Sequence, residues 1–138
     1  MTKFEKRIFT LTNIVISVIG VAYLIFKYFY SIETQFGERP HPLTGDLLHL
    51  HIITVPFLIF VIGHLFGRHI YPKLKSGKQK RKNSGVFILI LFILVSLSGY
   101  ILQIAVSEMN EIGIAHSVLS IFWFIFSVWH SRKNLKDL

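Results

Sequence analysis

The chain has no cysteine, only four prolines and only seven acidic residues among its 138 residues. Without cysteine it can form no disulfide framework, thiolate zinc site, iron–sulfur cluster or covalently attached c-type haem. Charged residues make up 16% of the chain, well below the roughly 25% of a soluble domain, whereas 52% are hydrophobic. Its net charge of +8 therefore indicates basic loops between membrane spans rather than a nucleic-acid partner.

Four apolar stretches are each long enough for the roughly 20 residues that a bilayer span needs. They predict helices over about 8–30, 47–70, 86–106 and 112–131. The segments between them are too short for a soluble domain, and the first stretch lacks the pattern of a cleavable signal peptide. We therefore expect a single all-α domain over 1–138, an integral membrane, up-and-down four-helix bundle.

The basic residues mark one side of this bundle. Thirteen of the fifteen lie near the N-terminus, between the second and third helices, or near the C-terminus. The other side holds Lys27 and Arg39 together with five of the seven acidic residues. By the positive-inside rule, this asymmetry predicts both termini in the cytoplasm of a bacterial inner membrane.

Histidines are confined to two of the four predicted helices. Six of the seven lie in or at the ends of the second and fourth: His49, His51, His64, His69, His116 and His130. Because polar side chains are costly inside membranes, this segregation predicts that some of them bind a ligand. The second and fourth helices of an up-and-down bundle run in the same direction, so their histidines would face each other at matching depths.

The fourth helix offers one histidine near each membrane surface. His116 and His130 are fourteen residues apart, which separates them by ~21 Å along a helix and by only ~40° around it. This pattern predicts two stacked ligand sites.

The second helix leaves two candidate pairs. His51 and His69 share a face but lie ~27 Å apart, whereas His49 and His64 lie ~22 Å apart but ~60° out of phase. On a straight helix His51 and His64 would be separated by ~140°. Pro56 can kink the helix and so weakens each of these phase arguments.

Opposed imidazoles without cysteine favour b-type haem, which is held by axial ligands alone. Zinc would require about four ligands clustered at one level. Arg68 and Arg132 lie at the depth expected for partners of haem propionates. The second nitrogen of each ligating imidazole needs a partner of its own, and Ser117 and Thr54 are close enough in sequence to provide one.

The segments LHLHIITVPFLIFVIGHLFGRHI, LSGYILQ and IAHSVLSIFWFIFSVWH resemble the small four-helix bacterial membrane cytochromes b, including hydrogenase-type di-haem subunits. The resemblance covers roughly 41–130. It implies two b-type haems, one bound by His51 and His116 and the other by His69 and His130, with His49 and His64 as alternates.

This resemblance implies an electron-transfer subunit of a respiratory oxidoreductase rather than a stand-alone enzyme. Electrons would move across or within the bilayer, between a quinone pool and a redox partner protein, with membrane lipid surrounding the helices. Two other functions fit the same sequence. One is a small transporter with a histidine-lined path, and the other is a structural subunit whose histidines only hydrogen-bond within the bundle.

Overall fold

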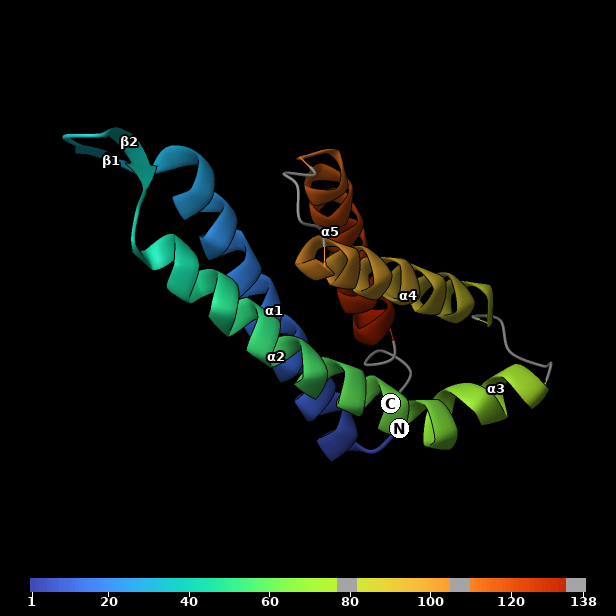
Figure 1. Ribbon diagram of the computed structural model, residues 1–138. Helices are drawn as coiled ribbons and strands as arrows, with labels where there is room; N and C mark the ends of the chain where they lie inside the picture. The colour runs from blue at the N-terminus through green and yellow to red at the C-terminus, as the bar shows by residue number, and fades with distance from the viewer. Residues whose placement is uncertain (77–81, 105–109, 134–138) are drawn as a thin grey trace. The chain divides into compact units, whose positions relative to one another are not determined.

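The computed structural model describes residues 1–76, 82–104 and 110–133, and it is mostly helical (Figure 1). The chain divides into two compact units, Met1–Arg68 and His69–Leu138. The first contains α1 (Lys3–Phe29), β1 (Ser31–Thr34), β2 (Gly37–Pro40) and α2 (Leu43–Leu65). The second contains α3 (Tyr71–Ser76), α4 (Lys82–Ile104) and α5 (Asn110–Lys133), and the π-helical turn η1 (Phe66–Ile70) spans the division.

Helix α1 begins five residues earlier than the hydrophobic pattern predicts. Thr2 is its N-cap: the Thr2 hydroxyl accepts from the Glu5 backbone N–H at 3.1 Å. The Thr2 backbone N–H in turn donates to Glu5 Oε2 at 2.7 Å. This capping box supplies partners to backbone groups that would otherwise have none at a helix start. The polar residues before the apolar stretch are therefore helical, and Glu5 belongs to the first turn.

A short β-hairpin, absent from the sequence prediction, joins α1 to α2. Strands β1 and β2 are antiparallel, with Ser31 opposite Pro40 and Thr34 opposite Gly37. Gly37 has φ of 99°, a left-handed conformation that glycine adopts without steric cost. The segment that was predicted to be a loop is therefore an ordered turn between the two helices.

The helix predicted over 47–70 is both longer and less regular than expected. It begins at Leu43, whose backbone N–H donates to Nδ1 of His41 at 3.2 Å, and it contains Pro56. After Leu65 the chain passes through η1 and then α3. A π-helical turn is wider than an α-helical turn, so regular α-helical phase does not apply to His69.

In the second unit, α4 and α5 pack along their length through aromatic side chains. The rings of Phe92 and Trp123 lie 5.8 Å apart, and those of Phe87 and Phe126 meet edge to face at 5.1 Å. Trp123 is only 4% exposed. The predicted end of the third helix, at 105–106, lies outside the described residues.

Helices α1 and α2 form one helical hairpin, and α4 and α5 form a second. Most other apolar side chains point away from the helical hairpin to which they belong. Phe57 is 65% exposed and Phe60 is 76% exposed. Among the described residues, four helical segments are long and apolar enough to cross a membrane: Lys3–Phe29, Leu43–Ser76, Asn83–Ile104 and Glu111–Ser131. Lipid can cover such faces while the helices satisfy their own backbone groups. The chain is therefore a helical, multi-pass membrane protein, as predicted; the four-helix bundle arrangement and the cytoplasmic termini stay predictions.

Candidate functional site

His116 lies directly against α4. Its Nδ1 is 3.0 Å from the Ser98 hydroxyl. Its Cε1 is 3.1 Å from the position that a Cβ on Gly99 would occupy, so the ring fills the space left by the missing side chain. A serine and a glycine on one helix thus orient a half-buried imidazole on the other.

The hydrogen bonds of Ser98 indicate which nitrogen of His116 carries the proton. The Ser98 hydroxyl donates to the carbonyl of Val95 at 3.0 Å. A hydroxyl has only one hydrogen to donate, so Ser98 accepts from Nδ1–H of His116. The neutral imidazole then carries its lone pair on Nε2. This is the tautomer in which a histidine can bind a metal through Nε2 while its other nitrogen is held.

The same arrangement recurs at His130. Its Nδ1 is 3.1 Å from the Ser84 hydroxyl, and its Cε1 is 3.9 Å from a Cβ position on Gly85. The two Ser-Gly dipeptides of α4 are fourteen residues apart, which is the spacing of the two histidines of α5. Because Ser84 contacts His130 and Ser98 contacts His116, α4 and α5 are antiparallel and the two spacings are in register.

In the first unit, His51 of α2 packs against α1. Its Cε1 is 3.1 Å and its Nδ1 is 3.4 Å from a Cβ position on Gly20. The corresponding distances between His116 and Gly99 are 3.1 Å and 3.6 Å. Each hairpin therefore places one imidazole of its second helix against a glycine of its first helix, with nearly the same geometry.

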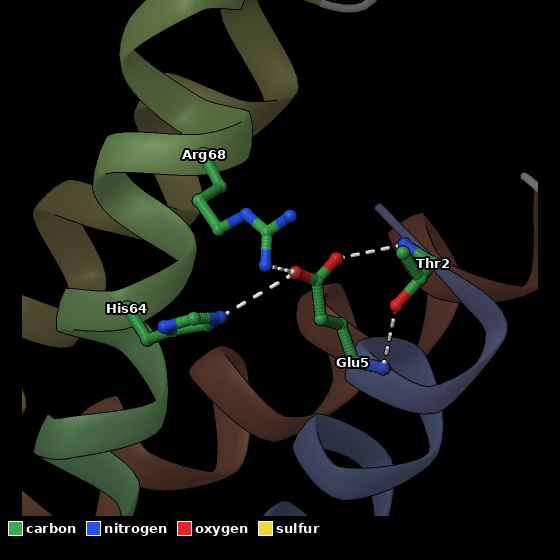
Figure 2. A network of polar contacts seen from close by, with 4 residues as sticks. All are labelled: Thr2, Glu5, His64 and Arg68. Carbon is green, nitrogen blue, oxygen red and sulfur yellow. Dashed lines mark hydrogen bonds and ion pairs between the residues drawn. The ribbon is translucent and has the colours of Figure 1, made fainter.

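A polar network joins the N-terminal end of α1 to the C-terminal end of α2 (Figure 2). Glu5 Oε1 lies 3.4 Å from Nε2 of His64 and 3.3 Å from Nη1 of Arg68, while Oε2 accepts from Thr2. The Glu5 side chain is 9% exposed. Its carboxylate is thus held between the two helices by contacts on both oxygens. Arg68, predicted to pair with a haem propionate, pairs with this carboxylate.

The predicted histidines of the first hairpin and η1 differ in exposure. His49 and His64 are exposed, whereas His69 in η1 is half-buried, as His51 is. The side chain of Arg132 lies outside the described part of the structure. The hydroxyls expected to partner the imidazoles bond elsewhere: Ser117 donates to the carbonyl of Gly113 at 2.8 Å, and Thr54 donates to that of His51 at 2.8 Å.

Sequence reasoning missed the residues that orient the histidines, namely Ser84, Ser98, Gly20, Gly99 and Glu5. The repeated Ser-Gly dipeptide could have revealed the first two, because its fourteen-residue spacing equals that of His116 and His130. Glu5 lies before the first apolar stretch, where no helix was predicted. Only the capping box, which extends α1 to Lys3, brings it to α2.

Within residues 1–76, 82–104 and 110–133, no three His, Asp or Glu side chains come together as a metal site. The donor set consists instead of single imidazoles, each held by the neighbouring helix of its own hairpin. Single imidazoles of this kind are the residues that would hold a b-type haem, which would supply a one-electron couple.

Comparison with known proteins adds no relative: no protein-family model, no curated protein and no solved structure matches the chain.

Proposed function

We propose that the chain is a di-haem b-type membrane cytochrome that carries electrons across or within the bilayer. Each hairpin would supply one imidazole to each haem. His51 and His116 would hold one haem, and His130 would hold the other together with His69, the residue given by the resemblance, or its alternate His64. When bound, a haem supplies a reversible one-electron couple.

The observation that carries this proposal is the hydrogen-bond chain from His116 through Ser98 to Val95. It keeps the proton on Nδ1 and the lone pair on Nε2. A histidine that ligates a metal commonly donates its other N–H to an oxygen acceptor, which fixes the ring orientation and raises the basicity of the ligand. Ser98 performs that role for His116, and Ser84 is placed to do so for His130.

Haem binding also requires that each ligating imidazole is held in a defined position, and the glycines of the neighbouring helix meet this requirement. The rings of His51 and His116 lie within contact distance of the Cβ positions of Gly20 and Gly99. Any side chain at residues 20 or 99 would compete for that space. The residues present therefore fit a haem held by imidazoles, because a neighbouring helix limits the movement of each ring.

The surrounding apolar residues would exclude water from these imidazoles. The core of the second hairpin contains the buried side chains of Trp123 and Leu91. Dry surroundings and held ligands are among the properties by which a protein tunes a haem potential. We propose that the chain passes electrons to or from a partner subunit, with a quinone as a further electron carrier.

The location follows from the charge distribution. We propose a bacterial inner membrane with both termini in the cytoplasm, since thirteen basic residues would then lie on the cytoplasmic side. On that side His130, Ser84 and Glu5 would form the inner level of the protein. His116, Ser98 and Gly20 would form the outer level.

The direct test is the visible spectrum and haem-to-protein ratio of the chain purified in detergent. We expect a reducible bis-imidazole haem signal and two haems per chain. His116→Ala and His130→Ala should each remove one haem. His41→Ala is the matched control, because His41 bonds to the start of α2 and should leave both haems bound. A chain without a reducible haem signal would refute the proposal.

One observation also favours a structural role without haem. His116, His130 and His64 each make a polar contact inside their own hairpin, as histidines that only hold helices together would. This role predicts that histidine substitutions lower thermal stability while the purified protein has no haem absorbance before or after reconstitution.

A further inference from the structure

The two hairpins share a pattern that extends beyond their outer glycine–histidine contacts. In the second hairpin, Ser84 and Gly99 of α4 are fifteen residues apart, and they contact His130 and His116 of α5. In the first hairpin, Glu5 and Gly20 of α1 are also fifteen residues apart. Gly20 contacts His51, which makes it the counterpart of Gly99.

Glu5 is then the counterpart of Ser84, and the histidine that it contacts is His64. From these correspondences we infer that His64, oriented by the carboxylate of Glu5, is the inner haem ligand of the first hairpin. This inference rests on the proposed function. It departs from the sequence resemblance, which implies His69 at that level.

Depth along the helix favours His64. His116 and His130 are fourteen residues apart, which corresponds to ~21 Å of rise. His51 and His64 are thirteen residues apart, or ~20 Å, whereas His51 and His69 are eighteen apart, or ~27 Å. Two ligands of one haem must lie at nearly the same depth. His64 meets that requirement within ~1.5 Å, and His69 misses it by ~6 Å.

Regular helical geometry would place His51 and His64 on different faces of α2, but both contact α1 in the structure. On a straight helix His51 and His64 would point ~140° apart. In the structure His51 contacts Gly20 and His64 contacts Glu5, so both rings reach residues of α1. Pro56 lies between them inside α2 and leaves the Ile52 carbonyl without its helical donor. The long Glu5 side chain covers the remaining gap.

Glu5 is built to hold an imidazole in place. Both of its carboxylate oxygens are engaged, Oε2 by the Thr2 N–H and Oε1 by His64 and Arg68 (Figure 2). The contact to His64, whose side chain is 46% exposed, is made at 3.4 Å through Nε2, so Nδ1 would be the ligating nitrogen. A carboxylate that accepts from the second nitrogen of a ligating histidine fixes the ring and makes it a stronger donor. Glu5 is therefore a positioning residue for His64.

The test compares His64→Leu and His69→Leu in the full chain, purified in detergent and reconstituted with excess haemin. We expect His64→Leu to hold half of the haem of the parent protein and His69→Leu to hold all of it. Loss of haem in His69→Leu, or full haem in His64→Leu, would overturn the assignment. A parent chain that binds no haem would instead refute the proposed function, and the assignment with it.

Glu5→Gln separates positioning from folding, because glutamine preserves the size of the side chain while removing its charge. We expect this variant to keep both haems and to raise the midpoint potential of one of them, measured by redox titration of the absorbance. Ser84→Ala is the equivalent substitution in the second hairpin. It should alter the potential of the same haem through His130. Unchanged potentials in Glu5→Gln would overturn the role of Glu5.

Discussion

Replacing Gly99 by alanine tests whether the His116 ring lies against α4. The new Cβ would lie 3.1 Å from Cε1 and 3.6 Å from Nδ1 of His116. Ordinary contact begins at 3.4 Å, so the ring must retreat by about 0.3 Å. That movement also pulls Nδ1 away from the Ser98 hydroxyl, which is now 3.0 Å distant.

Two opposing effects determine the change in stability. Alanine stabilises a helix interior by about 1 kcal/mol relative to glycine. Forcing the ring off its preferred rotamer costs about 0.5–1.5 kcal/mol, and weakening the Ser98 bond can cost up to about 1 kcal/mol more. Gly63 provides the reference, because nothing lies within 4 Å of its Cβ position in α2. Gly99→Ala should therefore be about 1–2 kcal/mol less stable than Gly63→Ala.

The assay is thermal unfolding of the haem-free chain in detergent, followed by its helical circular dichroism. Gly63→Ala should raise the midpoint by a few degrees, and Gly99→Ala should leave it unchanged or lower it. Gly85→Ala is a second control on α4, since its Cβ would lie 3.9 Å from His130, an ordinary contact distance. A Gly99→Ala variant as stable as Gly63→Ala would refute the packing of His116 on α4.

Three further substitutions test other contacts. Ser98→Ala should lose about 1 kcal/mol of unfolding free energy and weaken the binding of one haem. Ser98→Thr keeps the hydroxyl and should restore both the stability and the haem binding. Equal haem titrations for the two variants would contradict the role of that hydroxyl. Thr2→Ala removes the N-cap of α1 and should cost about 1 kcal/mol, measured by denaturant unfolding in detergent. Trp123→Ala should cost about 3–5 kcal/mol because the side chain is buried, while Phe60→Ala, on an exposed face of α2, should change the unfolding midpoint little; similar losses for both would show that Trp123 is not a core residue.

The number and type of spanning helices could be predicted from the sequence, because they depend on local composition. A stretch such as 86–106 is apolar for the length of a bilayer, and no partner is needed to recognise it. The restriction of six histidines to two of the stretches could be read in the same way. The fourteen-residue spacing of His116 and His130 predicted two stacked ligand sites, which stays a prediction. The contacts of both rings with α4 came from the structure.

The exact helix ends and the β1–β2 hairpin could not be predicted from hydrophobic length and residue spacing. The start of α1 depends on reciprocal hydrogen bonds between Thr2 and Glu5, and hydropathy does not register such bonds. The β1–β2 pairing depends on the left-handed conformation of Gly37. After α2, the π-helical turn η1 replaces the regular α-helix at Phe66–Ile70, which includes His69. Phase arguments that assume 3.6 residues per turn fail at such an interruption.

The sequence by itself determined the long apolar helices of a membrane protein and the spacing of the histidines along two of them, because hydrophobic length and residue spacing are properties of one segment. Only the tertiary structure decided what each histidine contacts. His116 meets Ser98, His51 meets Gly20 and His64 meets Glu5. These contacts join residues 18 to 59 positions apart on different helices. They depend on the register in which two antiparallel helices pack, and no single segment contains that register.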